Sequence, residues 1–348
     1  MPGIEPALAQ LLTVAWQGRP VRSYDIIGDI HGNGPKLDGL LEALGWTIGS
    51  DGHHQHHKPG RQAVFVGDLI DRGDHQRHVL HTVRRMVDAG AALIVMGNHE
   101  FNAIAYATPD PREPGEYLRK HTPKNERQHH EFLTQLDPDE RASWIDWFRT
   151  LPLWLDLGDL RVVHACWHER SIECLKKEKA FGGNRFPDGI DAIVNASAKG
   201  HPVYEAVEVV LKGPEIELAG YGLPDFLDKG GDRRSAARAR WWNADAKEIG
   251  DLIDLPHNTT TPDGSPYPVV PPTACCDADL SYAYAGSIAV FYGHHWRQWA
   301  PTEHLDFTAR TACVDFSAGK GGPLVAYRWR GEAEVNPCHF VAYPAVTP

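Results

Sequence analysis

The stretch Gly28-Asp29-Ile30-His31-Gly32 follows directly on a short apolar run, Tyr24-Asp25-Ile26-Ile27. The apolar run predicts a buried strand. The residues after the stretch predict a helix, because leucines recur there at helical spacing (Leu37, Leu40, Leu41 and Leu44). In extended backbone, Asp29 and His31 project from the same side. A carboxylate and an imidazole at the end of one strand can therefore bind the same divalent metal ion.

The same pattern of an apolar run followed by polar residues occurs twice more. Ala63–Val66 precedes Gly67-Asp68-Leu69-Ile70-Asp71-Arg72-Gly73, and Leu93–Met96 precedes Gly97-Asn98-His99-Glu100. Residues 75–88 between them have helical periodicity. Ligands of α/β proteins bind outside the carboxyl ends of the strands. We therefore expect the three polar clusters to meet at one edge of a sheet.

Two further histidines come at the ends of later predicted strands. His164 ends a strand that begins near Arg161, after a hairpin turn at Gly158-Asp159, and His294 follows the strand 287–292. A single Asp-x-His sequence is usually no more than a turn. Five clusters of metal-ligating residue types in succession, each at a strand end, predict a metal centre.

At these five clusters the sequence resembles the phosphoprotein phosphatase branch of the calcineurin-like metallophosphoesterases. That branch carries GDxHG, GDxxDRG, GNHE, a histidine after a strand, and GH, in this order. The resemblance covers roughly 22–165 and 286–330. It implies an α/β fold, a two-sheet αββα sandwich, within a single metallophosphoesterase domain over 1–348. The core would be about 22–169 and 286–330, and 170–285 would be an inserted cap or substrate region.

The resemblance also implies a site for two divalent metal ions. Asp68 would bind both ions, because a carboxylate has two oxygens with which to bridge them. The ligands of the first ion would be Asp29, His31 and Asp68, and those of the second Asp68, Asn98, His164 and His294. Manganese is expected from the family, while Fe, Zn, Co and Ni also accept this mixture of oxygen and nitrogen donors.

The catalytic roles come from the same resemblance. His99 corresponds to the residue that protonates the leaving oxygen, and Asp71 to the carboxylate that orients it. Arg72 and Asn98 would contact the substrate phosphate, which a hydroxide held between the metals would attack. A second phosphate-binding arginine is expected from the arginine-rich segment 233–248, where Arg240 and Arg238 are the candidates. We expect some helix in this segment, so a plain solvated helix face is the competing interpretation.

Three functions remain open at this level. The first is hydrolysis of phosphomonoesters, including phosphoserine and phosphothreonine in proteins, and the resemblance favours it. The alternative is hydrolysis of dinucleoside polyphosphates such as diadenosine tetraphosphate. A non-catalytic metal-binding scaffold is disfavoured, because such a protein would be expected to have lost some of Asp71, Arg72 and His99.

Composition excludes several other classes of protein. The net charge of −11 disfavours stable binding to nucleic acid, and no run of about 18 apolar residues predicts a membrane span. Met1–Gln17 lacks the basic start of a secretory signal and is expected to form an amphipathic helix. The six cysteines form no CxxC pair, which is typical of a reduced, cytoplasmic protein. The run His53–His57 is expected to lie in a surface loop.

Overall fold

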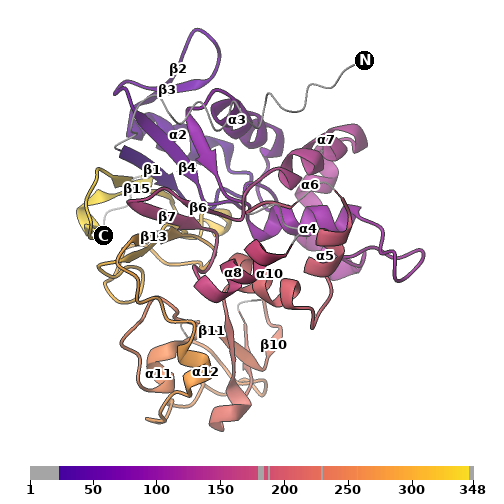
Figure 1. The fold of residues 1–348 in the computed structure, drawn as a ribbon, viewed down its shortest axis with the longest axis vertical. Coiled ribbons are helices and arrows are strands. Elements are labelled where there is room, and N and C mark those ends of the chain that lie inside the picture. The colour runs from indigo at the N-terminus through magenta and orange to yellow at the C-terminus, as the bar shows by residue number, and fades with distance from the viewer. Residues whose placement is uncertain (1–22, 179–183, 187–188, 229, 257, 345–348) are drawn as a thin grey trace.

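The computed structural model describes residues 23–178, 184–186, 189–228, 230–256 and 258–344, and two sheets form its centre (Figure 1). The first sheet has the strand order β16 (Phe340–Tyr343), β15 (Leu324–Trp329), β1 (Ser23–Ile27), β4 (Arg61–Phe65) and β5 (Ala92–Ile94). The second has the order β14 (Thr311–Cys313), β13 (Ala289–Tyr292), β7 (Leu160–Val163) and β6 (Trp154–Asp156). The predicted two-sheet α/β architecture is confirmed.

A hydrophobic core joins the two sheets. Ile26 and Val64 from the first sheet and Val162 and Phe291 from the second are fully buried in one cluster. The residues between them along each strand face the helices, as the period-two alternation of strands requires. Ile27 and Phe65, for example, belong to the larger cluster that also contains helical side chains.

The helices surround these sheets and bury their apolar sides in the larger cluster. The longer helices are α2 (Gly34–Leu44), α3 (Gln76–Asp88), α4 (Asn98–Ala107), α7 (Pro138–Arg149), α8 (Glu169–Lys177) and α10 (Pro202–Lys212). Shorter helices are α5 (Pro123–Gln128), α6 (His130–Gln135) and α9 (Asp191–Ala196). Leu37, Leu40 and Leu41 of α2 are all fully buried, as their spacing predicted.

Parallel pairing brings the polar clusters to one edge. In the first sheet β1, β4 and β5 run parallel, with Ile27 opposite Phe65 and Phe65 opposite Ile94. In the second sheet β7, β13 and β14 are parallel as well. Because all these strands end at corresponding positions, the loops that follow them converge.

Residues 215–280 form a lobe at one end of the molecule, where Figure 1 shows β10, β11, α11 and α12 together. Its sheet pairs β8 (Glu215–Glu217), β11 (Ala236–Ala239) and β12 (Ile253–Asp254). A smaller pair joins β9 (Phe226–Leu227) to β10 (Arg233–Arg234), and the helices are α11 (Ile249–Leu252) and α12 (Asp277–Leu280). The lobe has a hydrophobic cluster of its own. By contrast, α8 and α10 contribute to the larger cluster of the main body, so the extent of an insertion over 170–285 stays a prediction.

Two local predictions were wrong. The segment 233–248 contains strands β10 and β11 instead of helix, because buried Ala237 and Ala239 alternate with arginines at a period of two. The run His53–His57 contains β3 (His54–His56), which forms a hairpin with β2 (Trp46–Ile48). The predicted N-terminal helix over Met1–Gln17 lies outside the described residues.

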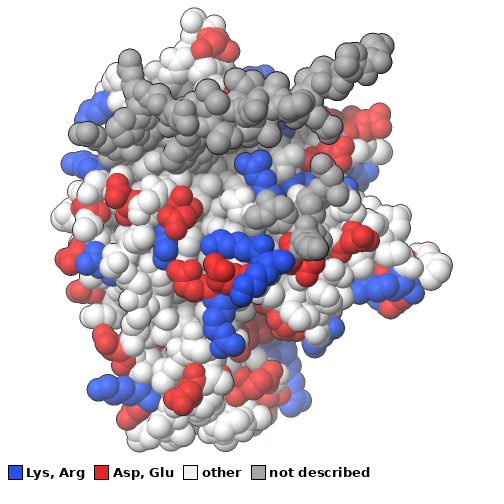
Figure 2. All heavy atoms as spheres, viewed as in Figure 1, with Lys and Arg blue, Asp and Glu red and all other residues white. Residues whose placement is uncertain are grey.

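The described surface and helices have two features that bear on charge and on membrane spans. Figure 2 shows acidic and basic side chains mixed over the face in view, on a chain of net charge −11. Within the described ranges, none of the helices combines the length and the apolar character needed to cross a membrane.

Candidate metal centre and active site

Two clusters of metal-ligating side chains share Asp68. One contains His31, Asp68 and His99, and the other contains Asp68, His164 and His294. Within each cluster one ligand atom per residue lies within 4.8 Å of the others. All of these residues are buried except His99, which is partly exposed. The structure therefore brings together side chains from all five sequence clusters around the single carboxylate of Asp68, and Asp29 of the first cluster lies nearby.

Backbone carbonyls orient two of the histidines as metal ligands require. Nδ1 of His31 donates to the Ile70 carbonyl at 2.9 Å, and Nδ1 of His164 donates to the Val66 carbonyl at 2.7 Å. Nε2 of each ring is thereby left to face the carboxylate of Asp68, at 3.6 Å from His31 and 3.4 Å from His164. Fixing one ring nitrogen so that the other can bind a metal is a recurring feature of metal sites.

Buried side-chain nitrogen and oxygen atoms without a hydrogen-bond partner indicate whether these residues fit metal ions. Oδ1 of Asp29, Nε2 of His31 and both ring nitrogens of His294 are buried and have no hydrogen-bond partner among the described residues. Buried polar atoms are normally satisfied, so several unpaired atoms in one place need an explanation. The side-chain amide oxygen of Asn98 lies 3.1 Å from Nε2 of His164 and is another possible metal ligand of the expected type. Divalent cations would satisfy this donor set, so the residues fit the predicted metals.

The distribution of charge in the site points the same way. Burial and the nearby carboxylates of Asp315 and Asp68 raise the pKa of Asp29 well above its usual value. Burial and the charge of Arg72 hold the pKa of His31 well below its usual value, so its ring is neutral. Crowded carboxylates beside neutral imidazoles favour a cation, because a metal ion relieves the repulsion that protonation otherwise relieves.

The backbone is strained where the ligands are placed. Residues with positive φ include His31, Asp68, Asp71, Arg72 and His294, all of them at the site. Side chains other than glycine rarely adopt this conformation, and such strain is concentrated at functional sites. The motif glycines permit the close approach of these loops, since a Cβ at Gly293 would lie 2.0 Å from Oδ1 of Asp29.

His99 is held by a carboxylate on the side away from Asp68. Its Nδ1 lies 2.5 Å from Asp71, and its Nε2 lies 3.8 Å from Asp68. The other oxygen of Asp71 accepts a hydrogen bond from Nδ1 of His129 at 2.7 Å. His129 is itself buried and stacks on Phe132 with ring centroids 4.7 Å apart. The ring of His99 can therefore present Nε2 to a substrate while Asp71 keeps it in place.

The arginines differ in their distance from the two clusters. The guanidinium of Arg72 lies over the ring of Trp296 at 4.1 Å, and its Nη2 is 3.5 Å from Nε2 of His99. Arg238 donates to the backbone carbonyl of His294 at 3.2 Å, which places it beside the second cluster. Arg240 is instead 3.5 Å from Asp254. Of the two predicted candidates, Arg238 is the one that contacts a ligand residue.

Sequence reasoning missed three residues that support the site. Glu100 is fully buried and accepts hydrogen bonds from the backbone amides of Asp68, Leu69 and Gly97, which fixes two motif loops to one another. Asp315 follows β14 and accepts from the amides of Trp296 and Ser317. Its position at a strand end is a signal that could have been used, whereas nothing near His129 in the sequence indicates its role.

Comparison with known proteins agrees with this description. Residues 23–193 match the calcineurin-like phosphoesterase family. Over 180 residues the chain is 33% identical to the bis(5'-nucleosyl)-tetraphosphatase PrpE (asymmetrical) of Bacillus subtilis (strain 168), covering 48% of this chain and 70% of that protein. It is 30% identical over 175 residues to the protein of the same name from Anoxybacillus flavithermus (strain DSM 21510 / WK1), covering 48% and 69%. A protein serine/threonine phosphatase from Saccharomyces cerevisiae is similar in three dimensions, with a TM-score of 0.43 and 12% identity over 93% of this chain and 79% of that chain.

Proposed function

The chain belongs to the calcineurin-like phosphoesterases, and on that premise we propose that it hydrolyses dinucleoside polyphosphates at the candidate metal centre. Two divalent ions would be held by Asp29, His31, Asp68, Asn98, His164 and His294. Such ions, when bound, polarise phosphoryl oxygens and acidify water. The shared position of Asp68 in both clusters is the observation that carries the assignment of a paired-metal phosphoesterase.

Arg72 and Arg238 are proposed to bind the phosphoryl group that is attacked. Each carries a guanidinium beside the clusters, and neither has a carboxylate within ion-pair distance among the described residues. A planar guanidinium donates two parallel hydrogen bonds to phosphoryl oxygens, which orients the group and stabilises the charge that develops on it.

His99 is proposed to donate the proton that the leaving oxygen needs. Its contact with Asp71 fixes the direction of Nε2. Loss of this proton donor should matter most for leaving groups that are strong bases. His99→Ala is therefore expected to keep its metals and to lose turnover most strongly on alkyl phosphates.

The substrate class is supported by the relatives. The resemblance found in the sequence favoured phosphomonoesters, but it concerned the family as a whole. The two PrpE proteins share 33% and 30% identity with this chain over about seven-tenths of their length, and their name describes a dinucleoside tetraphosphatase. They support the alternative, the dinucleoside polyphosphate, over the phosphoprotein.

A comparison of three substrates tests this proposal. The manganese-loaded protein is assayed with diadenosine tetraphosphate, a phosphothreonine peptide and p-nitrophenyl phosphate, and kcat/KM is determined for each. We expect the dinucleotide to be preferred by more than about a hundredfold, which corresponds to roughly 2.7 kcal/mol in the transition state. A preference of that size for the peptide would overturn the proposal and restore the phosphoprotein phosphatase.

A further inference from the structure

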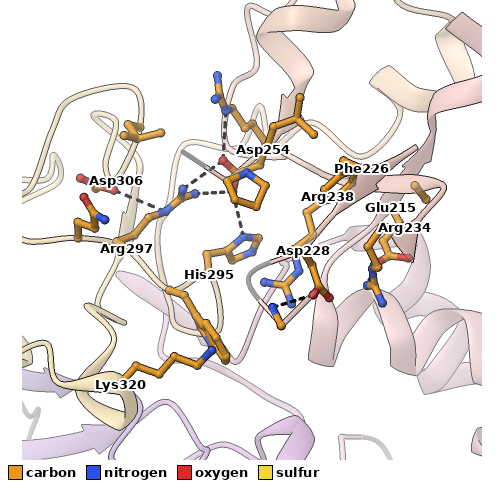
Figure 3. A pocket seen from close by; sticks show the side chains of 18 of the residues that line it. Glu215, Phe226, Asp228, Arg234, Arg238, Asp254, His295, Arg297, Asp306 and Lys320 are labelled. Carbon is orange, nitrogen blue, oxygen red and sulfur yellow. Dashed lines mark hydrogen bonds and ion pairs between the residues drawn. The ribbon is translucent and has the colours of Figure 1, made fainter. Parts of the chain in front are cut away.

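A cavity of about 750 Å³ lies between the metal centre and the lobe of residues 215–280. Its wall on the side of the metal centre includes His295 and Trp296, which follow the proposed ligand His294, and Arg238, which donates to the carbonyl of His294. Figure 3 shows Arg238 and Arg234 on one side of this space and His295, Arg297 and Asp254 on another. The volume is within the range of sites for small ligands, about 300–1,000 Å³.

One segment supplies a row of guanidinium groups to this cavity. Every second residue from 234 to 240 lines it, namely Arg234, Ala236, Arg238 and Arg240. The intervening Ala237 and Ala239 are buried in the lobe, so Ala236, Arg238 and Arg240 follow the period-two alternation of β11, whereas Arg234 ends β10. Side chains two positions apart on a strand are separated by about 7 Å. The guanidinium groups of Arg234, Arg238 and Arg240 are therefore spread along the wall, and that of Arg238 lies beside the metal centre.

The three arginines that line the cavity differ in their ion pairs. Arg238 has no carboxylate within ion-pair distance among the described residues, whereas Arg240 is 3.5 Å from Asp254 and Arg234 is 2.9 Å from Glu215. Asp254 is also 3.1 Å from Arg297, so Arg240 belongs to a fixed network. The side chain of Arg234 is 41% exposed, and its surface pair with Glu215 is of the weak kind that a phosphate can displace.

Another part of the wall is apolar. Leu255, Pro256, Trp299, Ala300 and Leu305 line it. Nε1 of Trp299 is buried and has no hydrogen-bond acceptor among the described residues. Five carboxylates also line the cavity, and each has a partner: Glu215 pairs with Arg234, Asp232 with Lys124, Asp254 and Asp306 with Arg297, and Asp228 accepts from a backbone amide. The arginines, of which Arg238 has no such pair in the described part of the chain, and the apolar surface with its unused donor supply the chemistry needed for a nucleoside polyphosphate.

We infer that this cavity binds the nucleoside polyphosphate that leaves during hydrolysis. The inference rests on the proposed function, since it assigns a binding site to the leaving half of the same substrate. Water adds to the attacked phosphorus, the bridging P–O bond breaks, and its electron pair remains on the terminal oxygen of the departing chain. His99 delivers a proton to that oxygen, and the proton that the attacking water loses passes to solvent, from which His99 is protonated again. The departing phosphates extend from Arg238, which binds the attacked phosphoryl group, toward Arg234, and the nucleoside lies against the apolar wall.

Arg234→Ala and Arg233→Ala form a matched pair for the test. The two arginines are adjacent on β10, but Arg233 does not line the cavity and pairs with Asp225 on the exposed surface. In the manganese-loaded full chain, kcat/KM is measured for diadenosine tetraphosphate and for p-nitrophenyl phosphate. We expect Arg234→Ala to lower the ratio of the two values at least tenfold and Arg233→Ala to change it less than twofold. Equal ratios in the two variants would overturn the inference.

A second measurement separates the cavity from the substrate assignment. ATP and tripolyphosphate are each tested as inhibitors of p-nitrophenyl phosphate hydrolysis. We expect ATP to inhibit more strongly than tripolyphosphate, and Arg234→Ala, but not Arg233→Ala, to raise the inhibition constant of ATP about tenfold. If this holds while diadenosine tetraphosphate is not cleaved, the proposed function fails and the cavity assignment stands. If the dinucleotide is cleaved and neither variant changes the inhibition constant of ATP, the cavity assignment alone fails. Equal inhibition by ATP and tripolyphosphate would overturn the proposed binding of the nucleoside to the apolar wall.

Discussion

Nδ1 of His99 lies 2.5 Å from Oδ2 of Asp71, a contact that joins the start of α4 to the loop after β4. The second oxygen of Asp71 is held by His129 at 2.7 Å. Although burial opposes it, the two histidines lower the pKa of Asp71 to about 2. The carboxylate is therefore ionised throughout the neutral range and accepts a hydrogen bond from each of the two histidines.

Replacing this carboxylate should damage proton donation more than substrate binding. We expect Asp71→Asn to lower kcat by about 10²–10³-fold for an alkyl phosphate, because general acid catalysis contributes about that much. The loss should be much smaller for p-nitrophenyl phosphate, whose leaving group departs without a proton. Turnover of both substrates is measured together with metal content, which should stay unchanged. An equal loss on the two substrates would show that Asp71 has another role.

His129 should act on the same step through Asp71. His129→Phe keeps an aromatic ring against Phe132 and removes the hydrogen bond to the carboxylate. A hydrogen bond to a charged group contributes about 1.5–3 kcal/mol, so we expect kcat for an alkyl phosphate to fall about tenfold or more. The neighbouring His130 is exposed and provides the control as His130→Ala. If the two variants had the same kcat, His129 would be merely structural.

The residues of the site show how far the sequence alone determines it. Asp29, Asp68 and Asn98 could be placed together from the sequence, because each follows a strand and parallel pairing fixes where such strands end. Asp315 follows β14 and was open to the same argument. His129 could not be found in this way, since it reaches Asp71 across 58 positions from the junction of two short helices.

The arginine-rich segment 233–248 shows a second limit. Alanine and arginine both have high helix propensity, and their mixture favoured a helix. The strand pairing of β11 with β8 and β12 prevails instead, because it buries Ala237 and Ala239 in the lobe. Tertiary packing therefore overrode the local preference for helix. The resulting strand also determines which arginines face the cavity.

Metal binding should stabilise the fold as well as support turnover. A ligand that binds only the folded state adds about 2.7 kcal/mol at a hundred times its dissociation constant. We expect Mn²⁺ to raise Tm by several degrees, a chelator to reverse the rise, and Asp68→Ala to abolish it together with activity. Asp74→Ala, a change in the exposed loop before α3, is the control. A metal-dependent Tm that survived in Asp68→Ala would contradict the shared role of Asp68.

Trp296 should position the guanidinium of Arg72. The ring lies 4.1 Å from the guanidinium carbon, and a cation–π contact contributes about 0.5–2 kcal/mol. We expect Trp296→Leu to raise KM for p-nitrophenyl phosphate about three- to thirtyfold with little change in kcat, and Trp296→Phe to recover part of the loss. If phenylalanine and leucine gave the same KM, the aromatic face would not be what positions Arg72.

Asp306 should make stability depend on pH. Burial raises its pKa to about 6, although the Thr302 amide and Arg297 act in the opposite direction. In the unfolded chain the pKa is about 3.9, so between about pH 4 and pH 6 the folded state binds the proton more tightly. The free energy of unfolding therefore falls as pH rises through this interval. Above pH 6 this contribution is constant.

Asp306→Asn should remove this part of the pH dependence. We expect the native protein to lose about 1–3 kcal/mol more than the variant between pH 4 and pH 7, the larger figure being two pKa units at 1.36 kcal/mol each. Urea unfolding is measured at both pH values with a chelator present, so that metal affinity does not contribute. Glu303→Gln, an exposed carboxyl on the same loop, should follow the native protein. A native pH dependence in Asp306→Asn would assign the effect to another carboxyl whose pKa burial raises, such as Glu100.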